Sequence, residues 1–592
     1  MALSKRMSNA LRANYSQQSA QLSFALDSFG GAVPLDPKLL LGSLSSADNS
    51  AFFATFDTGF YFLGPDARNQ STLLNFVDDL GLIAGSHQLK FGADYRTVFL
   101  DENPFRHQLE FTSSSVQSFS STGTASLLAG TALQAESRAQ ALSLYGQDSW
   151  NVNPHLMLLY GLRWELSPAP AARSGTVLAA WSNVETPSEI SLAPVGTPLW
   201  PTTYSNFAPR IGLAYNLTSK NDLVLRAGWG VFYDLGLGTS GDILNSFPNS
   251  ATGTVASVSL PVADLTPFLP SVVLQPPFPG VEAFSPHLKL PLSYQWNIAL
   301  EKSFANQQAL SATYVGQAGR RLLRREDMLS PNPNFSSFFV LTNNDASSDY
   351  NALQIQYRRP VGAHFQAMAS YTWSHSIDNS SNDALDFIAN AVIPNQHDRG
   401  SSDFDIRHSL SAALTYSFPA LSHPKYLAWI TNGWSVAPIF VARSGFPFNA
   451  SVLTFTVEGA RTRPDLVPGA PVWISNPLAP AGKSLNPAAF FVPSTFRQGT
   501  EGRNDIAGFG LAELDLSLAR KVQLTDVADL QFRADAFNLF NHPNFANPPA
   551  FVGIGPSFLQ SNQMLNQSLG GLNPLFQEGG PRSLQLSLKL SF

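Results

Sequence analysis

The last ten residues of the chain alternate between apolar and polar side chains without interruption. Side chains of a β-strand repeat every two residues, so this segment predicts a strand with one apolar and one polar face. The apolar face consists of Leu584, Leu586, Leu588, Leu590 and Phe592. A chain that ends on such a strand, with an aromatic residue in last place, is typical of a membrane-spanning cylinder whose wall faces lipid outside and water inside.

The same alternation recurs in many segments along the chain. Leu292, Tyr294 and Trp296 fall on one face of segment 292–300, and Ser293 and Gln295 fall on the other. These segments have the length of about ten residues that a tilted strand needs to cross a bilayer, whereas soluble strands usually have about five or six. The predicted hairpins join 73–83 to 89–99, 139–150 to 156–166, 207–216 to 223–233, 292–304 to 309–316, 350–359 to 364–375, 404–418 to 429–443, and 511–522 to 530–540. We therefore predict an all-β fold, a large antiparallel transmembrane β-barrel, with a soluble multi-sandwich or propeller protein as the alternative.

Tight turns and long linkers alternate between the predicted strands. One turn contains Gly85 and Ser86, and another contains Asn153 and Pro154. The long linkers cover residues 100–137, 167–205, 234–289, 317–349, 376–403, 444–505 and 541–582. Loops beyond about 15 residues are uncommon in compact domains, but bacterial barrels combine short periplasmic turns with long extracellular loops. Roughly eighteen strands are expected in one domain of residues 1–592, an even number as in such barrels, with 11–26 and 52–63 as strands of undetermined direction.

The composition agrees with a wall between lipid and a polar lumen. Charged residues make up 13% of the chain and hydrophobic residues 44%. No stretch approaches 18 consecutive apolar residues, so a membrane protein of this sequence must be a closed barrel, in which every backbone polar group is paired. The net charge of −6 argues against a nucleic-acid partner. The absence of cysteine excludes a disulfide scaffold and a cysteine-ligated metal.

Tryptophan residues lie in or at the ends of the predicted strands. An amphipathic ring is favoured at the headgroup level of a membrane, so these residues are expected to form an aromatic girdle, with ordinary core packing as the alternative. They are Trp150, Trp164, Trp229, Trp296, Trp373 and Trp434.

Two glycine-containing motifs resemble phosphate-binding loops only in part. Residues 236–241 match the pattern GxGxxG, but a dinucleotide-binding fold needs a helix directly afterwards, and Pro248 leaves no room for one. Residues 482–484 read Gly-Lys-Ser, but Pro477 stands where a phosphate loop requires glycine. The sequence therefore predicts no cofactor.

Histidine and aspartate residues cluster where a long linker meets a strand. The cluster consists of His397, Asp398, Asp403, Asp405 and His408. Imidazole and carboxylate groups can bind several metals, but their spacing fits no fixed ligand pattern. We interpret the cluster as a solvated rim of charge and predict no metal site. Similar polar loop residues, charged except for the neutral Asn504, occur at Arg461, Arg463, Asp465, Arg503, Asn504 and Asp505. With neither GxSxG nor HExxH present, the sequence predicts no catalytic residues and no enzyme.

Four stretches resemble motifs of the TonB-dependent receptors, especially the Oar-like group. Residues 532–545 resemble the penultimate strand of that group and its following loop. Residues 144–150 are similar to its strand ending in Gln-Asp-x-Trp, 404–408 to its Phe-Asp-x-Arg-His opening, and 206–212 to its Asn-Phe-Ala-Pro-Arg strand. With the terminal Phe592, these matches span most of the chain.

The resemblance implies a bacterial outer-membrane receptor that binds a scarce solute at its outer loops and imports it with energy from the TonB system. The solute would be a siderophore, an oligosaccharide or a peptide, and the residues that bind it are unknown. Other implied partners are outer-membrane lipid and the barrel-assembly machinery, which would recognise the C-terminal strand. A structural or adhesive surface protein is the alternative.

Several features of that group have no counterpart in this sequence. We find no signal peptide, TonB box, plug or regulatory-like domain in the 592 residues, and the barrel of the group has about twenty-two strands. The chain is therefore expected to be the C-terminal portion of a longer barrel protein.

Overall fold

Most described residues of the computed structural model belong to a single 24-stranded sheet. The structure describes residues 2–592 except for 26, 34–35, 37–40, 42–43, 45–49, 57–58, 221, 236–238, 263, 360–363, 382–397, 421–429, 454–460, 495–496, 553–558 and 566–578. Among these described residues, no helix has both the length and the apolar character needed to cross a membrane.

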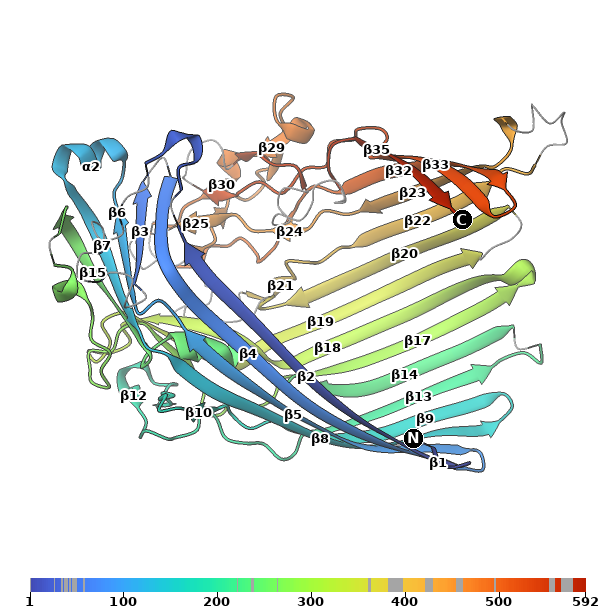
Figure 1. Cartoon of the computed structure of the whole chain (residues 1–592), viewed down its shortest axis with the longest axis horizontal. Coiled ribbons are helices and arrows are strands. Elements are labelled where there is room, and N and C mark those ends of the chain that lie inside the picture. Colours follow the sequence, from blue (N-terminus) through green and yellow to red (C-terminus); the bar gives the residue numbers. More distant parts are fainter. Residues whose placement is uncertain are drawn as a thin grey trace.

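Among the described residues, sixteen long strands follow one another as an antiparallel meander (Figure 1). In order of pairing they are β2 (Met7–Phe24), β4 (Gly59–Ala84), β5 (His87–Asn103), β8 (Ala135–Asn153), β9 (Leu156–Leu166), β13 (Phe207–Asn216), β14 (Leu223–Tyr233), β17 (Leu292–Phe304), β18 (Gln308–Leu329), β19 (Phe338–Arg359), β20 (Phe365–Asp378), β22 (His408–Ser417), β23 (Trp434–Arg443), β32 (Leu511–Thr525), β33 (Ala528–Phe537) and β35 (Ser583–Ser591). All seven predicted hairpins are confirmed, and the described residues form sixteen long wall strands where roughly eighteen strands were expected.

The meander is an open, curved sheet. Both termini and the short turns lie at one end, which we call the turn end, and the long connections lie at the other, the outer end (Figure 1). The short β1 (Ala2–Ser4) pairs with the start of β2. Beyond it, no described strand pairs with the free edge of β2, and β35 pairs only with β33 among the described residues. The described sheet therefore keeps two free edges.

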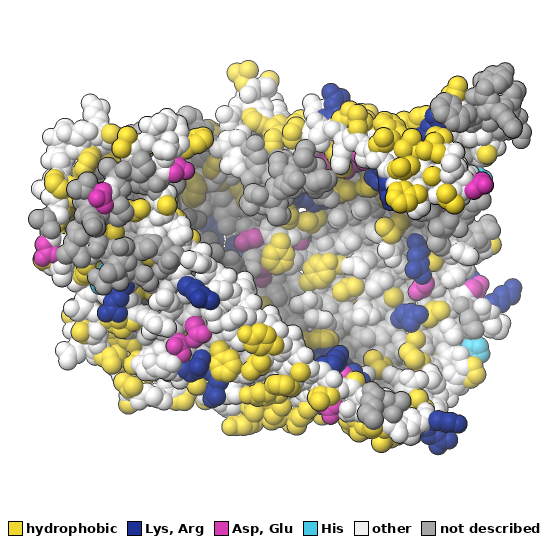
Figure 2. Space-filling view, viewed as in Figure 1, with side chains coloured by type: hydrophobic (Ala, Val, Ile, Leu, Met, Phe, Trp, Pro, Cys, Tyr) yellow, Lys and Arg dark blue, Asp and Glu magenta, His cyan; other side chains and the backbone are white. Residues whose placement is uncertain are grey.

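The register places apolar side chains in continuous rows on the outer face. Trp229 lies opposite Trp296, which in turn lies opposite Gly316. At the C-terminal edge, Phe532 lies opposite Leu588. Figure 2 shows hydrophobic side chains over the outer surface of the lower strands and a hollow between the two edges. Apolar outside and polar inside is the pattern of a transmembrane barrel wall.

Two segments differ from the sequence-based expectation. Residues 317–349, expected to be a linker, continue the ladder of β18 and β19, and only 330–337 form the turn. Segment 52–63, expected to be one strand, is instead a hairpin between β3 (Ser50–Phe56) and the start of β4. The same β3 begins an outer sheet, in which it pairs in parallel with β6 (His107–Thr112), followed by β7 (Thr124–Ala132) and β15 (Ser250–Ser259).

The long connections build apolar cores of their own at the outer end. Trp181 packs with Phe278 and Phe339, their ring centroids 5.2 and 5.4 Å away, within one such core. The smaller elements are η1 (Phe29–Gly31), α2 (Val116–Thr122), β10 (Ala171–Arg173), β11 (Trp181–Ser182), η3 (Pro187–Glu189), β12 (Ser191–Leu192), η4 (Thr239–Asn245), η5 (Thr266–Phe268), β16 (Val281–Phe284), η6 (Ala305–Gln307), β21 (Gly400–Ser401), β24 (Pro447–Phe448), β25 (Ser451–Leu453), β26 (Arg461–Thr462), β27 (Asp465–Leu466), β28 (Trp473–Ser475), η8 (Pro480–Gly482), β29 (Lys483–Leu485), η9 (Pro487–Ala489), β30 (Phe490–Phe491), β31 (Ile506–Ala507) and β34 (Phe551–Val552).

Candidate functional site

The inner face of the meander carries charged side chains that pair across neighbouring strands. Asp79 in β4 accepts a hydrogen bond from Tyr145 in β8. It also forms ion pairs with Arg12 in β2 and with Lys90 in β5, whose Nζ lies 3.0 Å from Asp79 Oδ1. Because the Asp79 carboxylate lies between two cations, these opposite charges partly compensate one another on this hydrophilic part of the wall.

A second polar group continues this wall towards β9. Arg163 lies 3.3 Å from Asp94 and also pairs with Glu165. The amide of Asn75 donates to Asp94 at 2.6 Å. Arg163 also stacks over the ring of Tyr145, with its guanidinium carbon 5.2 Å from the ring centroid. The polar inner face of β2, β4, β5, β8 and β9 is thus one connected network.

A third group of charges lies under the outer connections, buried except for the exposed Asp403, and we call it the outer ion cluster. It consists of Arg324, Asp398, Arg463, Glu501, Arg503, Asp378 and Asp403. Arg324 Nη2 lies 2.7 Å from Asp398 Oδ2, and Arg463 Nη1 lies 3.1 Å from Asp398 Oδ1. The arginines come from β18 and β26–β27, while Asp398 precedes β21. One carboxylate therefore ties three distant segments together.

Arg503 links segment 501–505 to the end of β20. Its guanidinium pairs with Asp378, donates to Ser381 at 2.8 Å and lies 3.3 Å from Asp403. The neighbouring Asn504 donates to Asp403 at 2.6 Å. These bonds fix segment 501–505 against the outer end of β20.

Glu501 is another buried carboxyl of the cluster, besides Asp378 and Asp398. Its Oε1 accepts a hydrogen bond of 2.9 Å from the backbone N–H of Ala450. Burial raises its pKa to about 8, outweighing the opposing effects of that N–H and of Arg463. The group consequently titrates near neutral pH, unlike an exposed glutamate.

The interpretation of a solvated rim is wrong for two members of the predicted His–Asp cluster. Asp398 is 3% and Asp405 is 4% exposed. Asp405 accepts a 2.7 Å hydrogen bond from the backbone N–H of Ser376 and pairs with His375. Both carboxylates can be buried because cationic or donor groups from other segments pair with them. The sequence alone does not reveal these pairings.

The remaining members behave differently. Asp403 and His408 are exposed, and His408 lies 2.8 Å from the Tyr371 hydroxyl. His397 lies outside the described residues. Within the described part of the chain, no group of three or more His, Cys, Asp or Glu residues could hold a metal ion.

The other loop charges and motifs are placed as follows. Asp465 pairs with Arg497 at 2.9 Å, and Asp505 is exposed. Arg461 lies in β26, but its side chain is outside the described residues. Residues 236–238 are likewise outside, and the rest of the GxGxxG segment begins η4, a 3-10 helix. Lys483 places Nζ 4.3 Å from the ring centroid of Trp473. No phosphate cradle is seen among the described residues of either motif.

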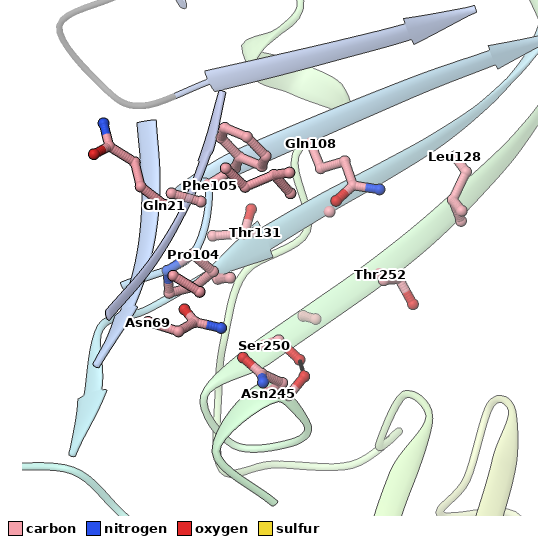
Figure 3. A pocket seen from close by; sticks show the side chains of 16 residues that line it. Gln21, Asn69, Pro104, Phe105, Gln108, Leu128, Thr131, Asn245, Ser250 and Thr252 are labelled. Carbon is pink, nitrogen blue, oxygen red and sulfur yellow. Dashed lines mark hydrogen bonds between the residues drawn. The ribbon is translucent and has the colours of Figure 1, made fainter. Parts of the chain in front are cut away.

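A pocket of about 560 Å³ lies where the outer sheet meets the rim of the meander, and we call it the rim pocket. Its walls come from β2 and β4, from Pro104 and Phe105 just after β5, from η4, and from β6, β7 and β15 (Figure 3). Figure 3 shows Asn69 and Asn245 near one another, with Gln108, Leu128 and Thr252 along the outer strands. Sequence reasoning missed this pocket because five strands, a 3-10 helix and the segment after β5, far apart in the chain, form it.

The predicted closing strand is present as β35. Leu584, Leu586 and Leu588 are between 62 and 70% exposed, and they share the apolar outer face with Leu590 and the 97% exposed Phe592. The opposite edge of β35 has no described partner. The closing role of these five residues therefore stays a prediction.

Comparison with known proteins agrees with this architecture. A family model described as an outer membrane beta barrel domain matches residues 1–585. The outer membrane transporter YddB from Escherichia coli is similar in fold, with a TM-score of 0.57 and 10% sequence identity over 99% of this chain. The copper transporter OprC was also matched, with a TM-score of 0.48 and 10% identity over 100% of this chain. The pyoverdine receptor FpvA of Pseudomonas aeruginosa PAO1 was matched with a TM-score of 0.48 and 10% identity over 99% of this chain.

The chain spans about three fifths of these longer proteins, covering 61% of YddB, 63% of OprC and 59% of FpvA. No curated protein sequence matches it. The expected fold class is confirmed, the outer membrane is its location, and the resemblance to TonB-dependent receptors is confirmed at the level of the fold. The chain belongs to the family of outer membrane β-barrel domains.

Proposed function

We propose that this chain is the barrel part of an outer-membrane receptor that binds a solute at its outer end and passes it inward. The observation that carries the proposal is the outer ion cluster, in which Asp398 holds Arg324 and Arg463 from separate segments. Such pairing orders long connections into a fixed surface above a polar interior, which is what selective capture requires.

The energy source and the assembly partner belong to the same proposal. Transport against a gradient needs energy that a barrel wall does not provide, and the TonB system would supply it. The exposed edge of β35, ending at Phe592, would be recognised by the barrel-assembly machinery. Lipid covers the apolar face that contains Leu588 and Phe532.

An uptake experiment on cells carrying the complete locus tests the proposal. Deletion of the gene is expected to abolish uptake of one of three radiolabelled probes, ferrichrome, maltotetraose or trialanine, and complementation should restore it. A protonophore should abolish the same uptake. Unchanged uptake of all three probes after deletion would contradict the proposal.

A structural or adhesive surface protein is the second candidate. It is favoured by the apolar cores of the outer connections, such as the one around Trp181, since a rigid surface can serve contact as well as capture. In this case deletion should change cell aggregation or attachment and leave uptake of every probe unaltered.

A further inference from the structure

Two arginine side chains lie next to one another on the outer face of the wall, towards its outer end. Residues directly opposite in an antiparallel ladder share a face, so the register of β17, β18 and β19 places Arg320 and Asp349 on the face of Trp296. Arg399 directly precedes β21 and reaches the same face, because it pairs with Asp349. Figure 1 shows β18, β19, β20 and β21 side by side in this part of the sheet.

A single carboxylate holds both guanidinium groups, and we call Arg320, Arg399 and Asp349 the arginine clamp. Arg320 Nη2 lies 2.7 Å from Asp349 Oδ1, while Arg399 Nη2 pairs with Asp349 Oδ2. The backbone oxygens of Gly319 and Ser348 accept hydrogen bonds of 2.8 and 2.9 Å from Arg320 Nη1. The two cations are therefore held side by side, and their charge exceeds that of the one carboxylate between them.

The clamp remains open to its surroundings. The side chains of Arg320 and Arg399 are 44% and 43% exposed. Ion pairs with this much exposure add little to the stability of a fold. An arginine has five N–H donors in a planar fork, and the bonds of the clamp to the described residues use only some of them. Both guanidinium groups can consequently donate to an anion from outside the chain.

The position of the clamp along the strand corresponds to the headgroup level of a membrane. Strand β18 starts at Gln308, at the turn end, and a tilted strand needs about 9–11 residues to cross the hydrocarbon layer. Leu310 and Tyr314 fall within that length on the outer face and are exposed, whereas Arg320 lies just beyond it. Trp373 of β20 is exposed on the same face, and such rings favour the boundary between hydrocarbon and headgroups.

The neighbouring strands continue the row of outward-facing cations. Asp405 Oδ2 lies 3.0 Å from Arg407 Nε and 3.1 Å from Nδ1 of His375, which follows Trp373 on the outer face. The carboxylate is buried, whereas the Arg407 side chain is 49% exposed. At this position too, the anion lies inside the protein and the cation faces outwards.

We propose that the arginine clamp binds a phosphate monoester of the outer-leaflet lipid, lipopolysaccharide, on the outside of the wall. A phosphate monoester carries nearly two negative charges and three terminal oxygens, and guanidinium groups bind phosphate through paired hydrogen bonds. Two adjacent forks can use all three oxygens, while a phosphodiester offers only two. The ligand is a lipid because the clamp directly continues the apolar face that contacts the bilayer. The inference concerns attachment to the membrane and does not depend on the proposed solute transport.

Binding can be measured on the full chain, purified in detergent micelles and freed of bound lipid. Native mass spectrometry with bisphosphorylated lipid A is expected to show binding about fivefold tighter than with enzymatically dephosphorylated lipid A or with phosphatidylglycerol. Equal binding of the dephosphorylated lipid or of phosphatidylglycerol would overturn the proposal. Displacement of lipid A by millimolar inorganic phosphate would assign the clamp to a free anion and overturn the lipid as its ligand.

Substitutions locate the site. Arg320→Gln and Arg399→Gln are each expected to weaken binding of bisphosphorylated lipid A by about fivefold, because each removes one guanidinium fork. Arg358→Gln is the matched control: Arg358 is also on β19 and 63% exposed, but it lies on the opposite face and pairs with Glu301. Equal affinity in all three variants would contradict the assignment.

Two further measurements separate binding from folding. The unfolding temperatures of Arg320→Gln and Arg358→Gln should be similar, since both substitutions remove exposed pairs. A lower unfolding temperature for Arg320→Gln, with unchanged preference for the phosphorylated lipid, would make the clamp a structural ion pair and refute the proposal. Arg320→Lys keeps the charge but loses the fork, so it should bind the phosphorylated lipid more weakly than the unmodified chain. Full affinity in Arg320→Lys would contradict recognition by paired guanidinium groups.

Discussion

Arg324 donates a hydrogen bond of 2.7 Å to Asp398, and their side chains are only 2% and 4% exposed. The two residues are 74 positions apart in the sequence. Because Asp398 also pairs with Arg463, its charge is shared between two buried cations. Removal of one member of a buried ion pair leaves the others without compensation, which is far more costly than loss of a surface pair.

Asp398→Asn is therefore expected to destabilise the outer connections by ~3–5 kcal/mol, the usual effect of breaking a buried pair. Hydrogen exchange in residues 444–510 should accelerate, while the meander strands stay protected. Asp465→Asn serves as the control, since its partner Arg497 is 48% exposed and such pairs contribute at most about 1 kcal/mol. Equal exchange in both variants would argue against a tethering role for Asp398.

The stability of the same region is expected to depend on pH through Glu501. Its folded-state pKa is raised to about 8 from 4.5 because the group is buried. A raised pKa means that the stabilisation is complete below the unfolded value and is lost as pH rises through about 8. Opening of residues 444–510, followed by hydrogen exchange corrected for intrinsic rates, should increase between pH 5 and about 8.

Glu501→Gln should remove that dependence, since a neutral amide does not titrate and its oxygen still accepts from Ala450. Glu189→Gln, an exposed position, should retain the full dependence. A pH profile that keeps its slope in Glu501→Gln would show that another group is responsible.

The position of Gly316 leaves no room for a side chain unless Trp296 moves. A Cβ there would lie 2.2 Å from the indole of Trp296 on the facing strand, so the ring must move. Gly316→Ala should lower the unfolding free energy by about 1–3 kcal/mol, as overpacking commonly does. Urea unfolding of the refolded protein in micelles would measure this, with Gly212→Ala as the control because its nearest atom is 3.5 Å away.

The two faces of β35 should respond differently to charge. Leu588→Arg places a cation on the face that contacts lipid and is expected to cost about 2–4 kcal/mol if it lies near the bilayer midplane. Ser587→Arg lies on the other face and should have a small effect. The yield of heat-modifiable protein in the outer-membrane fraction would distinguish them, and equal yields would contradict the assignment of faces.

The sequence predicted the meander well because each wall strand separates two solvents. Alternation such as that of Tyr294, Trp296 and Ile298 is imposed by lipid on one side, so strand and face can be read locally. The prediction failed for 317–349, where both sides of β18 and β19 are covered by protein or water. Apolar and polar residues therefore do not alternate regularly in this segment, and polar residues such as Arg324 and Asn343 are buried.

The outer ion cluster and the rim pocket could not be predicted from sequence. Asp398 becomes a buried anchor only because Arg463, 65 positions away, reaches it. Gln108 becomes a pocket residue only because β15 and η4 fold beside β6 and β7. A local pattern carries no information about such long-range pairing.

The directions of the two edge strands restrict the number of strands that can close the sheet into a cylinder. Strand β2 runs away from the turn end and β35 runs back towards it, because sixteen antiparallel strands separate the two edges. Direct joining of these edges would be antiparallel. Strands that bridge β2 and β35 in an alternating ladder must consequently be even in number, and the short β1, which already pairs with the start of β2, is the first of them.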